Sequence, residues 1–168
     1  FREADRLAAN VPAGAEGLLF VPYLSGEQSP GWNPEARGVV YGMTFQHDTG
    51  HFIRAAVEGM AFALLRVANA IEDVQGCAAQ TVYLTGGLTA SPMWTRTLAS
   101  VFGVPVIVQR SPESSARGAA ILGWLALGEA ASYDDFAQVG DPVQPDPALY
   151  ALYQDRFRTF CSLNDRLQ

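Results

Sequence analysis

The chain contains no lysine. All eleven of its cationic side chains are arginines, and 17 acidic residues outnumber them, which leaves a formal net charge of −6. A phosphate loop of the GxxxxGK[ST] type is therefore excluded, because its lysine is missing. The acidic balance also argues against a surface that binds nucleic acid or an anionic membrane.

Cysteine is scarce as well. Cys77 and Cys161 lie far apart and form no CxxC motif, which excludes a zinc ribbon and a disulfide scaffold and fits a reducing compartment. No apolar run reaches the roughly 18 residues of a membrane span, and no signal peptide opens the sequence. We therefore expect a cytoplasmic protein without a membrane partner.

The 168 residues that are present are 49% hydrophobic and 17% charged. That length is typical of one domain, and it can bury a core without disulfides. The chain opens on Phe1 rather than methionine. We therefore expect it to begin inside a longer protein, with residues 1–168 forming part of one domain.

Hydrophobic patterns divide the chain into strands and helices. Apolar runs predict four strands, at 17–23, 38–45, 81–85 and 104–109. Helical spacing predicts helices at 49–75, 91–102, 113–127 and 147–168, the first of them buried on most sides. Ser91-Pro92 and Ser111-Pro112 each give the cap-then-proline signal that starts a helix. A long loop rich in glycine and proline fills 25–37.

The alternation of strands and helices in the middle of the chain predicts crossover units. Such units build a largely parallel sheet with helices on its faces. Ligands of open sheets of this kind bind beyond the carboxyl ends of the strands. We therefore expect the Gly86-Gly87 turn, which follows one strand, and Glu113, which follows the next, to share one cleft.

The GGLTAS turn at Gly86–Ser91 is the most informative local feature. Paired glycines leave room for a planar ligand against the backbone, and the next helix offers free N–H groups at its start. A tight strand-to-helix turn without a ligand explains the same residues equally well.

Two pairs of polar residues on or near the longest predicted helix can have a structural role instead of a functional one. His47 and His51 are four residues apart at the helix start but lack the HExxH glutamate, so capping is favoured over metal binding. Glu58 either faces the cleft or pairs with Arg54 at the i, i+4 spacing. No pair of carboxylates has a spacing diagnostic of catalysis.

Two further features also have alternative explanations. The small residues of 116–120 (ARGAA) favour close packing of a helix on the sheet over contact with a ligand. Tyr23 and Trp32 are expected to anchor the 25–37 loop, and stacking on a sugar is the alternative.

Several motifs together resemble the C-terminal domain of the FGGY family of carbohydrate kinases. The resemblance covers residues 17–128 in the order of the family. Its four segments are PYLSGEQSPGWNPEARG (Pro22–Gly38), GVVYGM with HFIRAAVE (Gly38–Glu58), VYLTGGLTASPMWTRTLASVFGVPVIV (Val82–Val108) and ESSARGAAILG (Glu113–Gly123).

Residues 84–120 also resemble the wider actin and Hsp70 ATPase superfamily. The resemblance implies a ribonuclease H-like (actin-like ATPase) α/β fold. Its sheet would be mixed and mostly parallel, flanked by helices and lacking its first strands.

The resemblance also implies an activity: transfer of a phosphoryl group from ATP, with magnesium, to a hydroxyl of a sugar or polyol in a cleft between two domains. It places Gly86, Gly87 and Leu88 beside the adenine and ribose. It gives Ser91 a hydrogen bond to the base or ribose, and it turns Glu113 toward the same pocket.

The family's catalytic aspartate and phosphate loops precede everything matched here. The resemblance therefore implies that this chain is the adenosine side of the kinase and is inactive alone. An N-terminal kinase domain would be its partner and would hold most of the magnesium ligands. The expected substrate is gluconate or xylulose.

A protein of another class remains an alternative. The same fold without its catalytic half could serve as a non-catalytic module for ligand binding or assembly. Such a module could form a homodimer through the open edge of the sheet. A chaperone ATPase is disfavoured, because Pro22–Gly38 has no place in that family.

Overall fold

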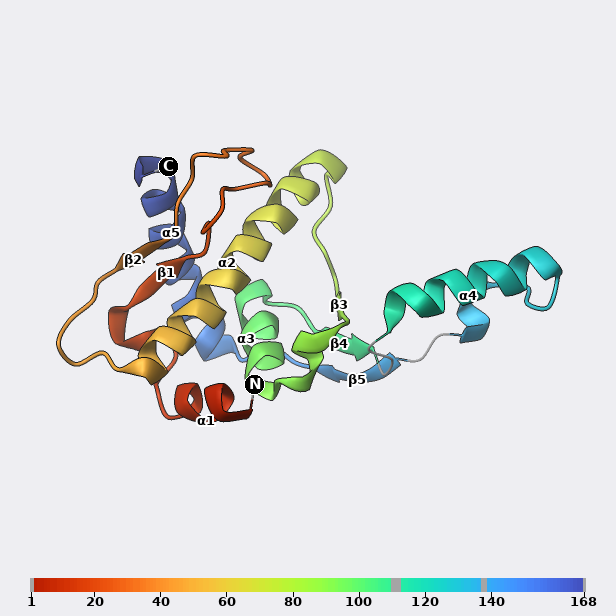
Figure 1. The fold of residues 1–168 in the computed structure, drawn as a ribbon, viewed down its shortest axis with the longest axis horizontal. Coiled ribbons are helices and arrows are strands. Elements are labelled where there is room, and N and C mark those ends of the chain that lie inside the picture. The colour runs from red at the N-terminus through yellow and green to blue at the C-terminus, as the bar shows by residue number, and fades with distance from the viewer. Residues whose placement is uncertain (1, 110–112, 137–138, 168) are drawn as a thin grey trace.

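The computed structural model describes residues 2–109, 113–136 and 139–167. They form a mixed α/β structure that is rich in helix and has two small sheets (Figure 1). The helices are α1 (Arg2–Ala9), α2 (Thr49–Gln75), α3 (Pro92–Phe102), α4 (Ser114–Leu127) and α5 (Pro147–Leu167), with 3-10 turns η1 (Ala15–Gly17), η2 (Gly87–Ala90) and η3 (Tyr133–Phe136). The strands are β1 (Leu19–Val21), β2 (Val39–Tyr41), β3 (Val82–Leu84), β4 (Val106–Gln109) and β5 (Val139–Val143). None of the described helices is long and apolar enough to cross a bilayer.

The two sheets correct the expected strand directions. One sheet pairs β1 with β2 in antiparallel register, and the other has the order β3-β4-β5. Within it, β3 and β4 are parallel and β4 and β5 are antiparallel. The prediction of a mostly parallel sheet is therefore wrong for the described residues. Among the described strand pairs, the one parallel pair is β3 with β4, and α3 supplies the crossover connection that such pairing needs.

The four predicted strands are confirmed, each shorter than its apolar run, and β5 is an addition. The sequence of β5 contains Gly140, Asp141 and Pro142, residue types that are depleted in strands. Proline is tolerated there because β5 lies at the edge of its sheet. The predicted cap by Ser111 and Pro112 lies outside the described residues.

The core lies where α2, α3 and α5 meet β1. Its largest fully buried side chains include Phe62, Tyr153 and Phe160, and the ring of Phe62 meets that of Tyr153 edge-on at 6.0 Å. Gly59 lets α2 approach β1 closely, because a side chain there would overlap the carbonyl of Phe20. Helix α2 and β1 therefore form one tightly packed unit.

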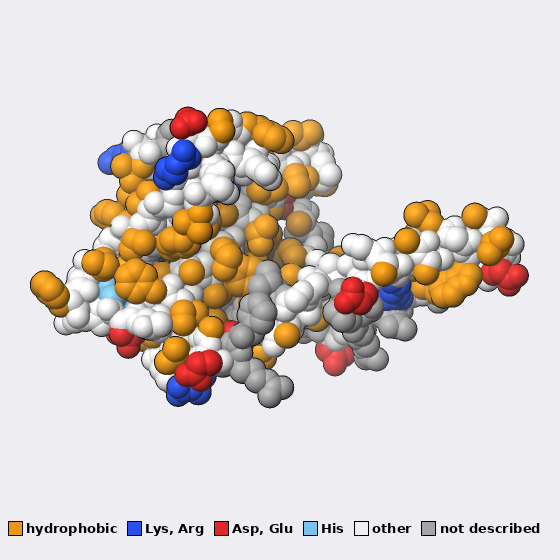
Figure 2. Space-filling model, viewed as in Figure 1, with side chains coloured by type: hydrophobic (Ala, Val, Ile, Leu, Met, Phe, Trp, Pro, Cys, Tyr) orange, Lys and Arg blue, Asp and Glu red, His pale blue; other side chains and the backbone are white. Residues whose placement is uncertain are grey.

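The other side of α2 is exposed. The residues that we call the α2 apolar face recur at steps of three and four: Met60, Leu64, Val67, Ile71 and Val74. Leu64 is 45% exposed and Val74 is 88% exposed. Figure 2 shows hydrophobic side chains gathered on the side of the molecule over which α2 runs. The prediction that α2 is buried on most sides is therefore wrong.

Helix α4 and η3 extend away from the rest of the structure (Figure 1). A side chain added at Gly118 would meet no atom within 4 Å, and Leu122 and Leu127 are exposed. The prediction that 116–120 packs on the sheet is therefore wrong. Helix α4 contacts η3, where Trp124 stacks on Phe136 with ring centres 5.0 Å apart.

A buried carboxylate joins three segments of the chain. Glu58 on α2 is 2% exposed, and its Oε1 accepts hydrogen bonds from the Gly14 amide at 2.9 Å, Arg54 Nε at 2.8 Å and the Tyr153 hydroxyl at 3.0 Å. Arg54 also donates to the Tyr153 hydroxyl. The i, i+4 pair predicted for Glu58 is confirmed. Burial, together with the charge of Glu58, raises the pKa of Tyr153 to about 12, so the phenol stays a donor.

We expect Glu58→Ala to lower the free energy of unfolding by about 3 to 5 kcal/mol, because it leaves the largely buried Arg54 charge without its carboxylate partner. Tyr153→Phe removes one hydrogen bond and is expected to cost about 1 to 2 kcal/mol. Urea denaturation measures both. Asp155→Ala, which breaks an exposed pair with Arg158, is the control and should change the free energy by less than about 1 kcal/mol. Equal effects of Glu58→Ala and the control would contradict the role given to Glu58.

The start of α2 confirms the capping prediction for His51, whose Nδ1 accepts from the Asp48 amide at 3.2 Å. His47 lies before the helix, and its Nδ1 accepts from the Thr44 amide at 2.9 Å. The Asp48 carboxylate accepts from the His51 amide at 3.2 Å, and His51 Nδ1 lies 2.7 Å from Asp48 Oδ1. His51 Nε2 lies 3.3 Å from the Glu16 carboxylate. The hydrogen bond with Asp48 is the main cause that raises the pKa of His51, and Glu16 adds to it. The same bond lowers the pKa of Asp48.

These two directions predict how stability depends on pH. A raised pKa of His51 stabilises the fold fully below the unfolded value near 6.5, and this contribution is lost as the pH rises through the folded pKa. The contribution of Asp48 is present above its unfolded value near 3.9 and is lost only at lower pH. The free energy of unfolding should therefore fall as the pH rises above about 6.5 and through the raised pKa of His51. His51→Gln keeps a capping residue and should flatten this slope; an unchanged slope in that variant would refute the assignment.

Candidate functional site

The turn after β3 is held by hydrogen bonds within the turn itself. Gly86 has a positive φ of 85°, which glycine adopts without strain. Its carbonyl accepts from the Thr89 amide at 3.1 Å and from the Thr89 hydroxyl at 2.7 Å. These bonds fold Gly87–Ala90 into η2 and carry the chain directly into α3.

The space beside this turn is open. A Cβ added at Gly86 or at Gly87 would meet no other atom within 4 Å. The backbone of Leu88 belongs to η2, and its side chain lies outside the described residues. No described atom outside the turn therefore crowds the backbone at either glycine.

Ser91 lies at the join between the turn and α3. Its hydroxyl oxygen accepts from the Trp94 amide at 3.1 Å, which is the predicted N-cap. The hydroxyl also donates to Asp5 Oδ1 on α1 at 2.9 Å, and the residue is 4% exposed. The sequence analysis missed Asp5, because a contact over 86 residues leaves no local pattern.

Glu113 caps no amide of α4 with its side chain, and it is exposed. It follows β4, whose Val108 is the register partner of Leu84 in β3. Gly86 and Glu113 therefore both follow the carboxyl ends of neighbouring parallel strands. Residues 110–112 between β4 and Glu113 lie outside the described part, so the cleft expected between Gly86 and Glu113 stays a prediction.

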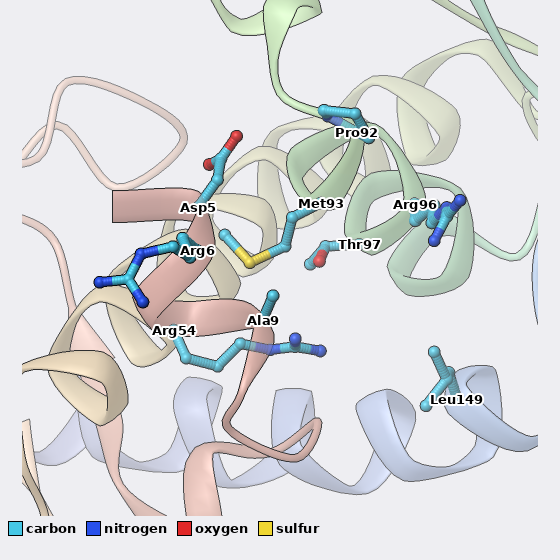
Figure 3. A pocket seen from close by; sticks show the side chains of 9 residues that line it. All are labelled: Asp5, Arg6, Ala9, Arg54, Pro92, Met93, Arg96, Thr97 and Leu149. Atoms are coloured by element: carbon cyan, nitrogen blue, oxygen red, sulfur yellow. The ribbon is translucent and has the colours of Figure 1, made fainter. Parts of the chain in front are cut away.

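A cavity of about 520 Å³ lies beside α1, next to the Ser91–Asp5 contact (Figure 3). Its lining comes from α1, α2, α3 and α5: Asp5, Arg6, Ala9, Arg54, Pro92, Met93, Arg96, Thr97 and Leu149. The guanidinium of Arg54 is fixed by Glu58 and Tyr153. Sequence reasoning did not find this cavity, because no motif connects residues drawn from four helices.

The loop at 25–37 is anchored by one aromatic residue and exposes the other. Arg66 on α2 donates to the Tyr23 hydroxyl at 3.1 Å and to Glu27 Oε1 at 2.8 Å. Glu27 is buried and also accepts from the Gly31 amide at 3.3 Å. The anchoring role is therefore confirmed for Tyr23 and wrong for Trp32, which is 76% exposed.

Comparison with known proteins shows the family to which this chain belongs. Residues 2–127 match the model of the FGGY family of carbohydrate kinases, C-terminal domain. The gluconokinase of Bacillus subtilis is 40% identical over 129 residues, which cover 77% of this chain and 25% of that protein. The xylulose kinase of Escherichia coli is 35% identical over 175 residues, covering 95% of this chain and 36% of that protein.

Solved structures of kinases resemble this chain as well. A ligand-bound xylulose kinase from Lactobacillus acidophilus superposes with a TM-score of 0.90 at 30% identity, over 99% of this chain and 34% of that one. The gluconate kinase of the same organism gives a TM-score of 0.89 at 30% identity, with the same coverage. The chain belongs to the FGGY family of carbohydrate kinases, to its C-terminal domain. It spans about a quarter of the gluconokinase and about a third of the xylulose kinases.

The two glycines of the turn should respond differently to alanine. Gly86→Ala places a side chain at φ 85° and is expected to cost about 1 to 2 kcal/mol of stability. Gly87→Ala meets open space at an ordinary φ, and its effect should stay within about 1 kcal/mol in the stabilising direction. Thermal or urea unfolding of both variants measures the contrast. Equal destabilisation would show that the turn differs from the one described.

Proposed function

We propose that this chain forms the adenosine side of the ATP site of a carbohydrate kinase. Gly86, Gly87 and Leu88 border the adenine and ribose, while Ser91 and Glu113 face the same nucleoside. The observation that carries the proposal is the open Gly86-Gly87 turn, at the carboxyl end of a parallel strand and inside the segment that matches the family. FGGY kinases use ATP, which supports this choice of nucleotide.

The chemistry divides between this chain and the rest of the kinase. Phosphoryl transfer depends on positioning the two substrates and on stabilising charge. The turn and the N-terminus of α3 contribute binding and orientation of the nucleoside. The general base and the phosphate loops would belong to an N-terminal domain. This division is supported by the length of the relatives, which are about three to four times as long as the matched part.

Magnesium does not fit the described residues. No group of three or more His, Cys, Asp or Glu side chains among them is placed to hold a metal ion. Mg²⁺ at kinase sites is usually held by carboxylates together with the phosphates of the nucleotide. We therefore derive no step through magnesium on this chain and assign its ligands to the other domain.

Gluconate is the proposed substrate, and xylulose is the second choice. The gluconokinases of two Bacillus species are 40% and 41% identical to this chain over 129 residues. Glycerol kinases reach 41% over 127 residues, so glycerol belongs among the compounds to be tested.

We further propose that the fold is ribonuclease H-like and that a strand from the N-terminal part lies between β1 and β3. Among the described strands, β1 pairs with β2 and β3 pairs with β4, so each has one edge without a strand partner. The α2 apolar face is exposed as well. An inserted strand would join the two sheets and remove both open edges, which folded proteins seldom leave uncovered.

A non-catalytic assembly module is the second candidate. The exposed α2 apolar face and the free edges of β1 and β3 favour it, because a second copy of the chain could cover them. The mass in solution separates the candidates. A stable dimer of this chain that binds ATP favours the module, and a chain that binds ATP only with its N-terminal domain favours the kinase.

The test compares the longer polypeptide that contains this chain with residues 1–168 alone. We expect ATP-dependent phosphorylation of gluconate by the longer protein, less with xylulose and glycerol, and none by residues 1–168. Gly87→Leu should raise the Kd for ATP by at least about tenfold, since loss of about 1.4 kcal/mol of binding suffices, with the unfolding temperature nearly unchanged. Gly123→Leu, also in open space but on α4, is the matched control.

Two outcomes would contradict the proposal. One is a coding region that carries no phosphate-loop domain before Phe1. The other is a longer protein in which Gly87→Leu and Gly123→Leu bind ATP with equal affinity. The first removes the kinase, and the second removes the nucleoside site from the turn while leaving the kinase in place.

A further inference from the structure

We propose that the cavity beside α1 binds a small organic anion, one that carries a phosphate or carboxylate group on an apolar body. The anionic group would meet Arg54, Thr97 and Arg96. The apolar body would lie against Met93 and Leu149. The inference goes beyond the proposed function and does not depend on it, because it rests on the lining of the cavity alone.

The size and the lining of the cavity suit such a ligand. Its volume of about 520 Å³ lies within the roughly 300 to 1,000 Å³ of small-molecule sites, which are mostly apolar with a few placed polar groups. Ala9, Met93 and Leu149 supply apolar wall from three different helices. Three of the nine lining residues are arginines and one is acidic, in a chain whose net charge is −6. The lining therefore favours an anion, against the charge of the chain as a whole.

Arg54 is held ready to donate to a ligand. Its side chain is 11% exposed, its Nε donates to Glu58 at 2.8 Å, and one terminal nitrogen donates to the Tyr153 hydroxyl at 3.0 Å. A guanidinium has five N–H groups, and these two contacts are the ones it makes within the described part of the chain. Figure 3 shows the guanidinium directed to the side on which Arg96 and Leu149 lie. Because the group is already fixed, binding would cost little side-chain entropy.

Two side chains of α3 complete the polar end of the cavity. Thr97 is 3% exposed, and Figure 3 shows it between Met93 and Arg54. Its hydroxyl has no hydrogen-bond partner among the described residues, and a buried hydroxyl in that state is unfavourable. Arg96 is exposed, and residues 2–109, 113–136 and 139–167 likewise give it no ion pair. A phosphate or carboxylate oxygen can accept from both, and the guanidinium fork matches either group.

The other two charges of the lining predict opposite effects. Arg6 contributes little, because it is exposed and paired with Glu3 at 2.6 Å, and Figure 3 shows it extending away from the other labelled side chains. Asp5 opposes binding, because its carboxylate lines the cavity and would repel an anion. Removing the charge of Asp5 should therefore strengthen binding, whereas removing the charge of Arg96 should weaken it.

The test titrates phenyl phosphate, inorganic phosphate and benzyl alcohol into the longer polypeptide that contains this chain, by calorimetry at constant ionic strength. We expect a Kd for phenyl phosphate below about 1 mM. Inorganic phosphate lacks the apolar body and should bind more weakly. Benzyl alcohol keeps the ring but lacks the charge, and it should not bind measurably.

Four variants assign the binding to the cavity. Arg96→Gln should raise the Kd for phenyl phosphate by about tenfold or more, since it removes a charge-assisted hydrogen bond. Thr97→Val keeps the shape of the side chain and should raise the Kd by about threefold or more. Asp5→Asn should lower it by about threefold or more. Arg158→Gln removes an equal charge from an exposed pair on α5 and, as the matched control, should leave the Kd within about twofold.

Four outcomes would overturn the inference. The first is that the longer protein binds neither anion, and the second is that Arg96→Gln and Arg158→Gln have equal effects. The third is binding by residues 1–168 but not by the longer protein, which would show that polypeptide before Phe1 fills the cavity. The fourth is displacement of phenyl phosphate by adenosine, which would assign the cavity to a nucleoside. Phosphorylation of gluconate by the longer protein is measured separately, so a failure of the proposed function is distinguished from a failure here.

Discussion

The carboxylate of Glu58 is the interaction on which the structure depends. It is almost completely buried, and one of its oxygens accepts from the backbone at Gly14, from Arg54 and from Tyr153. A buried charge of this kind is tolerated only when it is paired and hydrogen-bonded. Its partners come from the segment before β1, from α2 and from α5. One side chain therefore fixes the start of the chain and its last helix on the longest helix.

That fixed frame also positions the candidate site. The segment before β1 begins with α1, which carries Asp5 to Ser91 at the first turn of α3. The open Gly86-Gly87 turn precedes Ser91 directly, and its shape comes from Thr89 and its own backbone. The turn can therefore keep its geometry without side chains at Gly86 and Gly87. Rigidity comes from the buried frame, and the room for a ligand comes from the two glycines.

The sequence predicted the positions of helices and strands better than it predicted which of their faces are buried. The Ser91 cap, the Tyr23 anchor and the pair of Glu58 with Arg54 were all readable, because each depends on local spacing or residue type. Strand β5 could not be predicted, because it contains glycine and proline, which are depleted in strands. The burial of α2 and α4 was predicted wrongly, because an apolar face shows that a helix needs a partner and not whether this chain supplies it. The contact between Asp5 and Ser91 leaves no trace in any local pattern.

The exposed apolar surfaces and the proposed division of the kinase explain each other. The α2 apolar face and the extended α4 bury little within this chain, yet nearly the whole chain superposes on kinases about three times as long. A chain that shares its fold with longer kinases while its apolar faces are exposed is expected to form one part of a larger hydrophobic core. Covering those faces would add hydrophobic stabilisation of about 25 cal/mol for each Å² buried.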